Sequence, residues 1–333
     1  MGGLPLFPLD APILGLQRVE VADGAATIKH RIGFSRLAAC QASAEPAGAR
    51  MVDATIRWTL YIVSLVVVGP VAGMLMRLTN APDGSAGTPL ASSSPVVGAV
   101  CLILGAVLAA AIGGFAAWRC GLRPGLTCAG IVVAWMAGMS ASTQSAISAF
   151  GEGPWGLLVV EGVVVAACLV GIGVVITLAA QRHVPAPGEH ITAQSAEAME
   201  AEKTLTFSGR SAGAMAIAAA GGAAAAWFLA VTDLKGQVIA AAALAAIVIA
   251  VLAKLVDLKT PAVGAIGAAA LLAVVGPAYA YATVAADTAL AAAYAQALPG
   301  IVRITPLDWA AGALLGTPLG LAWAASIVKR AEH

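Results

Sequence analysis

Hydrophobic residues gather in long runs along the chain, separated by short polar or basic breaks. About 20 consecutive apolar residues are needed to cross a hydrocarbon core of roughly 30 Å, and eight runs approach or exceed that length. The runs cover residues 58–76, 96–118, 125–149, 155–180, 212–231, 238–253, 262–282 and 307–328. This pattern predicts an all-α, polytopic bundle of about eight transmembrane helices.

Composition supports a membrane protein. Of the 333 residues, 60% are hydrophobic and only 11% are charged, and the mean hydropathy is +0.91. Soluble domains carry about 25% charged residues, because their surfaces face water. A net charge of +1 provides no basic field for nucleic acid. The expected partner is therefore the lipid bilayer, and nucleic acid is not expected.

The distribution of Lys and Arg predicts the orientation, because basic loops tend to stay in the cytoplasm. With the N-terminus inside, the cytoplasmic segments contain 15 of the 18 basic residues. Arg77, Lys235 and Arg303 are the exceptions. An odd number of spans would break this pattern. We expect both termini to be cytoplasmic, with the chain in the plasma (inner) membrane.

The chain divides into four parts by pattern. A tail at 1–56 precedes a first four-helix half at 57–180, a cytoplasmic linker at 181–211 and a second half at 212–333. Residues 1–50 contain prolines and mixed charges but no run long enough to span. One hypothesis is that translation begins at Met51; the alternative is a cytoplasmic tail.

The two halves place basic residues and glycines at similar positions along their spans. Gly69 follows Arg57 by twelve residues, and Gly222 follows Arg210 by the same interval. Four spans per half would give both halves the same orientation, as in parallel transporter repeats. The alternative is that membrane helices in general carry basic residues and prolines at their ends.

Glu161 is the one carboxylate in the interior of an apolar run, and ionisable groups in spans suggest a functional site. Gln144 and Glu161 each lie about 9 Å from the turn that joins their helices, so they could hydrogen-bond. Ser140, Gln144 and Ser148 share one helix face. The predicted substrate-binding residues are Glu161, Gln144, Ser140, Ser145 and Ser148. Alternatively these side chains join helices, or Glu161 reaches the headgroups.

Other residues suggest structural roles. Asp308 is expected to cap the last run. Small residues at a spacing of four predict close helix packing, within the chain or with another copy or partner protein. These residues are Gly312, Gly316 and Gly320 in the last run, and Gly69 and Gly73 in the first. Prolines inside the runs, at Pro70, Pro277 and Pro318, predict kinks.

Several chemistries are not expected. All four histidines lie outside the runs, which argues against intramembrane haem and a Ser–His nucleophile. Glu161 is the only carboxylate predicted to be buried in the membrane. A paired-aspartate protease needs two, so that activity is not expected. No HExxH, GxGxxG or P-loop sequence occurs. His183, Glu189 and His190 match no metal motif and read as a solvated linker. We therefore expect no enzyme, no cofactor and no metal.

The turn Gly114-Phe-Ala-Ala-Trp-Arg-Cys-Gly-Leu-Arg123 resembles the cytoplasmic turn of major facilitator transporters, which also follows their second span. Trp118 replaces that motif's acidic residue, and that family has twelve spans, so the family is not assigned. Two functions remain: a small permease or channel-like transporter of a polar solute or ion, and a non-catalytic membrane subunit or scaffold that packs against partner membrane proteins.

Overall fold

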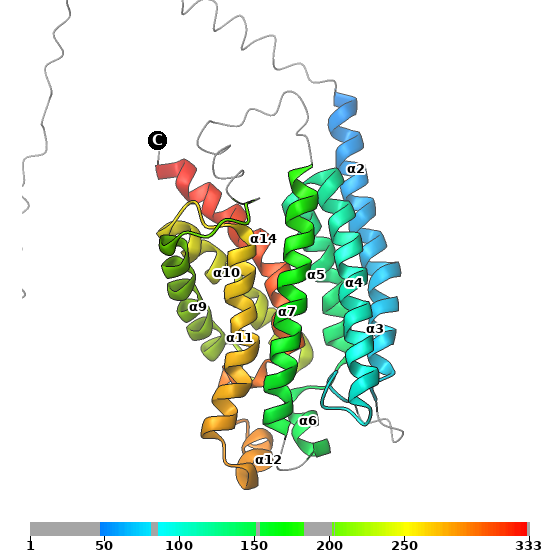
Figure 1. Cartoon of the computed structure of the whole chain (residues 1–333), viewed down its shortest axis with the longest axis vertical. Coiled ribbons are helices and arrows are strands. Elements are labelled where there is room, and N and C mark those ends of the chain that lie inside the picture. Colours follow the sequence, from blue (N-terminus) through cyan, green and yellow to red (C-terminus); the bar gives the residue numbers. More distant parts are fainter. Residues whose placement is uncertain (1–46, 81–85, 151–153, 183–201, 203, 332–333) are drawn as a thin grey trace, which may run out of the picture. The chain divides into compact units, whose positions relative to one another are not determined.

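The computed structural model describes residues 47–331 except 81–85, 151–153, 183–201 and 203 (Figure 1). This part of the chain consists of helices and their connections, without β-strands. Most of the predicted tail lies outside the described residues. So do His183, Glu189 and His190, the group weighed as a metal site.

Eight helical segments in the described residues are long and apolar enough to span a membrane, so the prediction of an eight-span helical bundle is confirmed. The spans, in order, are α2 (Ala47–Val63) with η1 (Ser64–Val68) and α3 (Gly69–Arg77), α4 (Pro95–Cys120), α5 (Leu122–Met139) with α6 (Thr143–Phe150), α7 (Pro154–Gln181), α9 (Gly209–Leu229), α10 (Lys235–Val256), α11 (Ala262–Thr283) and α14 (Pro306–Ala331). The short helices α12 (Ala286–Tyr294) and α13 (Gly300–Arg303) connect the last two spans.

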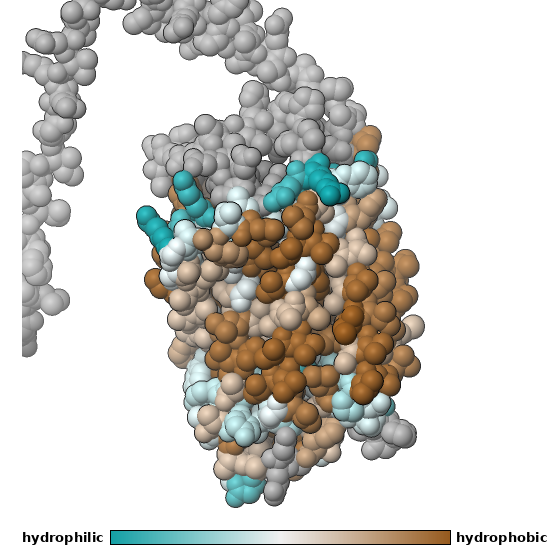
Figure 2. Space-filling view, viewed as in Figure 1, coloured by the Kyte–Doolittle hydropathy of each residue, from teal (hydrophilic) through white to brown (hydrophobic). Residues whose placement is uncertain are grey.

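The bundle has two chemically different ends. We call one the basic end, where α2 begins, α14 ends, and the turns carry Arg119, Arg123 and Lys259. The other is the loop end, formed by residues 78–94, the break between α5 and α6, 230–234 and 284–305. Figure 2 shows hydrophilic residues at the basic end and brown, hydrophobic ones over the middle.

Large apolar side chains cover the outside of the bundle. Trp58 is 65% exposed, Ile103 51% and Phe228 78%. Such a surface would be costly in water, whereas lipid tails solvate it. Together with the eight spans, this surface identifies an integral membrane protein.

The third span is not one helix, which corrects the predicted run at 125–149. It stops at Met139 and resumes at Thr143. Ser140 Oγ donates to the carbonyl of Ala137, and Ser142 Oγ accepts from the amide of Ser145. Serine side chains that bond nearby backbone offer the chain an alternative to helical hydrogen bonds. The polar cluster therefore interrupts the helix instead of decorating one face of it.

The first span is also irregular. Helix α2 begins at Ala47, but the stretch apolar enough to span runs from Ala54 to Arg77, close to the predicted boundary at 57. It contains the π-helical turn η1 just before Pro70. Proline has no amide hydrogen, and its ring clashes with the carbonyl four residues earlier. The wider π turn accommodates that clash. Pro277 and Pro318 lie inside α11 and α14.

Glycines allow α14 to approach α10 closely. A Cβ at Gly316 would overlap the carbonyl oxygen of Ala243, and one at Gly320 would lie 2.7 Å from that of Ile247. Gly312 lies equally close to Ala242. The glycine stripe of the last span therefore forms a contact inside this chain. Gly69 and Gly73, in turn, lie against Trp135 of α5.

Two helix contacts are the most extensive of those that join the first four spans to the last four. α7 packs along α11, and α5 packs along α14. Gly162 of α7 lies against the backbone of α11, because a Cβ there would be 2.5 Å from the carbonyl oxygen of Ala273. The polar residues described next lie beside these two contacts.

Candidate functional site

Glu161 lies inside the protein, one position before the glycine that contacts α11. Its side chain is fully buried. Its Oε2 atom accepts hydrogen bonds from Thr88 Oγ1, at 2.6 Å, and from the Leu90 amide, at 2.8 Å. Its Oε1 atom is buried and has no hydrogen-bond partner within the described residues. The carboxylate therefore holds the connection between α3 and α4 against α7 through Oε2. Its other oxygen, Oε1, makes no hydrogen bond among the described residues.

That connection enters the bundle. Thr88 and Ala91 are fully buried, and the Thr88 amide donates to the Ala91 carbonyl at 3.0 Å. The Gly87 carbonyl accepts from the Ala141 amide, at 3.1 Å, in the break of the third span. Non-helical backbone is tolerated at membrane depth when protein surrounds it. Two irregular segments therefore meet beside Glu161.

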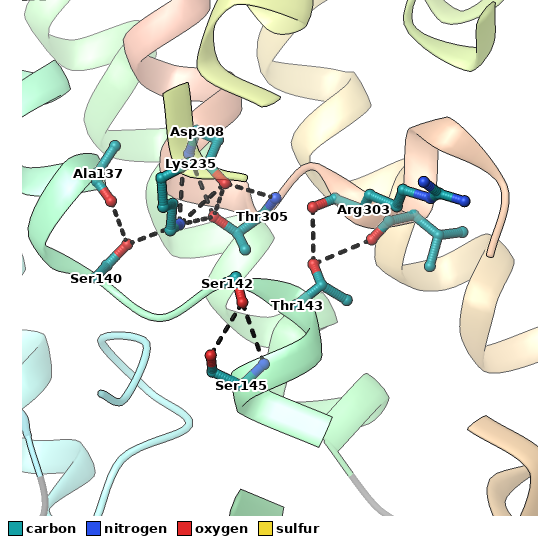
Figure 3. Close-up of polar contacts among 10 residues, drawn as sticks. Ala137, Ser140, Ser142, Thr143, Ser145, Lys235, Arg303, Thr305 and Asp308 are labelled. Atoms are coloured by element: carbon teal, nitrogen blue, oxygen red, sulfur yellow. Dashed lines mark hydrogen bonds and ion pairs between the residues drawn. The ribbon is translucent and has the colours of Figure 1, made fainter. Parts of the chain in front are cut away.

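A buried ion pair occupies the same end of the bundle (Figure 3). Lys235 Nζ, at the start of α10, lies 3.0 and 3.1 Å from the two carboxylate oxygens of Asp308 in α14. It also donates to Ser140 Oγ at 3.2 Å. Asp308 is fully buried, and the side chain of Lys235 is 19% exposed. One ammonium thus links α10, α14 and the break of the third span.

Asp308 also caps its own helix, as predicted. Its Oδ2 atom accepts from the amide of Thr305 at 3.1 Å and from its hydroxyl at 2.7 Å. The Asp308 amide lies 3.4 Å from Thr305 Oγ1, which completes a reciprocal capping box. The cap holds the carboxylate in place for Lys235.

Arg303 anchors the segment that leads into α14. Its guanidinium donates to the carbonyls of Leu298, Val231 and Gln296. Thr143, the first residue of α6, donates its hydroxyl to the Arg303 carbonyl at 2.9 Å. The arginine is buried but satisfied by carbonyl oxygens, so its role is to hold the loop end together.

Asp233 makes the stability of the loop end depend on pH. It is 9% exposed, and its Oδ1 atom has no hydrogen-bond partner among the described residues. Burial raises the pKa of Asp233 above its ordinary 3.8, although Arg303 and Gln296 oppose the shift. The folded state then binds more protons than the unfolded state at pH values from about the ordinary pKa up through the raised one.

We therefore expect stability to fall as the pH rises through that window, and we expect Asp233→Asn to remove this loss. Melting temperatures of both proteins in one mild detergent, at pH 4 and pH 7, test the sign. The melting temperature of the variant, relative to that of the wild type, should rise between pH 4 and pH 7. Parallel curves for the two proteins would contradict the prediction.

The predicted residues do not form one pocket with Glu161. Ser140 binds Lys235, whereas Ser145 bonds to Ser142 in the adjoining turn. Gln144 makes no hydrogen bond to Glu161, so the prediction that they pair is not realised. Ser148 is exposed and donates to the carbonyl of Ser145. Because the helix breaks at 140–142, Ser140 is separated from Gln144 and Ser148, which lie together on α6.

Other parts of the network escaped the sequence reasoning. The view that Glu161 is the only buried carboxylate is wrong, because Asp308 is fully buried too. The alternative that Glu161 reaches the headgroups is also wrong. Thr88 lies outside every apolar run and gave no signal. Lys235 and Asp308 did give a signal in the sequence. They carry opposite charges, and each stands next to the start of a span at the same end of the bundle.

The arrangement suits the binding of a small positive charge. Lys235 and Asp308 neutralise each other, which leaves Glu161 as a carboxylate with no ion pair among the described residues. A single carboxylate oxygen in a dry site can take up a proton or one cation. Among the described residues, no three His, Cys, Asp or Glu side chains converge as metal ligands.

Comparison of the chain with protein-family models, with curated proteins and with solved structures finds no match.

Proposed function

We propose that this protein is a small, non-enzymatic membrane transporter of a polar solute or ion, and that its path passes between the two four-span halves at the loop end. One observation carries the proposal. Glu161 and Asp308 are fully buried beside the contacts that join the halves, where the third span breaks, and Lys235 pairs with Asp308 there. Transporters commonly place their sites at such an interface, on discontinuous helices.

The helix pairings support a four-plus-four repeat. Exchanging each span with the span four positions later turns the contact of α7 with α11 into that of α14 with α5. It likewise turns the contact of α4 with α7 into that of α10 with α14. A pseudo-twofold axis along the membrane normal would relate such halves. Glu161 and Asp308 would then come from corresponding spans.

The charges favour a cytoplasmic basic end, and with it cytoplasmic termini and a location in the plasma membrane. Of the three basic residues at the loop end, Arg303 is buried and Lys235 is ion-paired. Arg77 is the one of the three that is exposed. The basic residues at the other end include the exposed Arg57 and Arg182. This asymmetry is the one that retains loops in the cytoplasm.

Solvent access to the break of the third span tests transport directly. In a protein without its native cysteines, Ser142→Cys should react with an impermeant thiol reagent from the loop end in right-side-out vesicles and from the basic end in inverted vesicles. The half-buried Ser142 lies about 12 Å from the loop-end tip of α6. In an alternating-access transporter, the path to Ser142 would open first to one side of the membrane and then to the other.

Two single-cysteine controls fix the sidedness. Ser148→Cys at the loop end and Arg182→Cys at the basic end are exposed and should each react from one side only. Reaction of Ser142→Cys from a single side, or from neither, would contradict alternating access.

Protection from both sides would favour the second candidate function, a membrane subunit that packs against partner proteins. A specific observation favours that candidate: protein groups already satisfy the cations of the network. Lys235 has Asp308 and Ser140, and Arg303 has three carbonyls. Polar groups that only join helices would be satisfied in this way.

A lipid-soluble carbodiimide should modify Glu161, because an unpaired carboxylate in a dry site tends to hold a proton. The reagent adds to the protonated carboxyl, and rearrangement leaves a stable N-acylurea, so the mass rises by that of one reagent molecule. Peptide mass spectrometry should find the adduct on Glu161 and none in Glu161→Gln. Asp308, paired with Lys235, is the internal control. Equal labelling of both carboxylates, or no labelling of Glu161, would contradict this assignment.

A further inference from the structure

An apolar groove lies on the membrane-facing side of the second half. It has a volume of about 550 Å³ and is formed by α7, α9, α11 and residues 205–207. Its lining is entirely apolar and includes Val170, Phe207, Met215 and Leu271. α9 has the smallest buried share of the eight spans, so this side of the bundle is the most open to lipid.

The groove has the depth of one membrane leaflet. α9 and α11 both begin at the basic end, and the groove uses the first turns of each. From Val263 to Leu271 it extends about 12 Å along α11. Half of a hydrocarbon core is about 15 Å. An extended hydrocarbon chain from the basic-end leaflet therefore matches its length.

Two glycines of α11 shape the groove. A Cβ at Gly264 would lie 2.6 Å from Met215 Sδ, so this glycine lets α9 approach α11. Gly267 also lines the groove, and a Cβ there would meet no atom within 4 Å. The space beside Gly267 is therefore open and can be filled by mutation without displacing protein atoms.

Two helices that form the groove carry exposed arginines at the basic end. Arg210 lies in the first turn of α9, three residues after Phe207, and is exposed. Arg182, which follows α7 directly, is also exposed at the basic end. The first turn of α9 contains no acidic residue. The positive end of the α9 dipole adds to the attraction for an anion.

We infer that this groove binds an anionic phospholipid, with one acyl chain along α11 and the phosphate beside Arg210. Basic residues at the membrane surface select anionic headgroups, and the apolar channel selects a chain. This site is independent of the transport proposed above. A lipid held there would contact α7 of the first half and α9 and α11 of the second.

The test uses the full chain in a mild detergent, with dioleoyl phosphatidylglycerol or dioleoyl phosphatidylcholine added at equal concentration. Native mass spectrometry measures the lipid retained. We expect the wild type to retain phosphatidylglycerol about fivefold better, from the contribution of one arginine near the surface. Arg210→Gln should reduce that preference to near unity.

Gly267→Phe should abolish the tightly held lipid by filling the groove. The matched control is Gly213→Phe: Gly213 lies on α9 at the same end, is exposed, does not line the groove and also has free space at its Cβ. Equal melting temperatures without added lipid would establish that both variants fold.

Three outcomes would overturn the inference: equal retention of the two lipids by the wild type, unchanged binding by Gly267→Phe, or loss of a dimer rather than of a lipid in that variant. The last would mean that a second copy of the chain occupies the groove.

Discussion

Replacing Lys235 with methionine is expected to lower the free energy of unfolding by about 3–5 kcal/mol, the usual cost of leaving one partner of a buried ion pair uncompensated. Asp308 is fully buried, and its other hydrogen bonds come from the amide and hydroxyl of Thr305. Without the ammonium, a carboxylate would remain in a dry site between α10 and α14. Ser140 would also lose its contact with Lys235.

The double variant Lys235→Met/Asp308→Asn separates this charge effect from lost packing. Asparagine is uncharged but keeps an oxygen that can accept from Thr305, so the helix cap survives. We expect the double variant to recover most of the stability lost in Lys235→Met. Unfolding by a denaturing detergent, followed by circular dichroism, measures the wild type, the two single variants Lys235→Met and Asp308→Asn, and the double variant. If the two single losses simply added, the ion pair would not be coupled, and the account would fail.

Gly316→Leu is expected to be similarly damaging, with a loss of about 3 kcal/mol or more, at the upper end for overpacked sites. The added side chain would overlap the carbonyl oxygen of Ala243, which belongs to helix backbone and cannot rotate away. α14 would have to move off α10. The ion pair between Lys235 and Asp308 joins the same two helices, so it should weaken as well.

Gly171→Leu is the matched control for that substitution. Gly171 lies within α7, is exposed to lipid, and has no atom within 4 Å of a Cβ. Leucine there should leave the melting temperature unchanged or raise it slightly, because glycine is the poorer helix former. A loss in Gly171→Leu equal to that in Gly316→Leu would show that removal of any helical glycine is harmful, and would contradict the close-contact explanation.

The membrane helices could be predicted from the sequence because a bilayer imposes a local rule. Each span must satisfy its own backbone hydrogen bonds and be apolar over about 20 residues, so length and hydropathy reveal it without knowledge of its neighbours. The same reasoning identified the capping role of Asp308, since a cap acts within three residues of the chain.

The sequence indicated the polar residues of the third span but not the break that they cause. The polar residues at 140–148 were conspicuous in the sequence, but periodicity places polar residues on a helix face and does not say when serines will replace the backbone hydrogen bonds. Pairing Gln144 with Glu161 assumed a continuous helix. That assumption failed at Ser140, where the chain turns toward Lys235.

By itself the sequence determined that this protein spans a membrane about eight times, because hydropathy and segment length act locally. Only the tertiary structure decided which polar groups meet. Thr88 reaches Glu161 across 73 positions of the chain, and Lys235 reaches Asp308 across the same number. Such contacts depend on how the helices within each half pack, and an isolated apolar run carries no information about its neighbour's face.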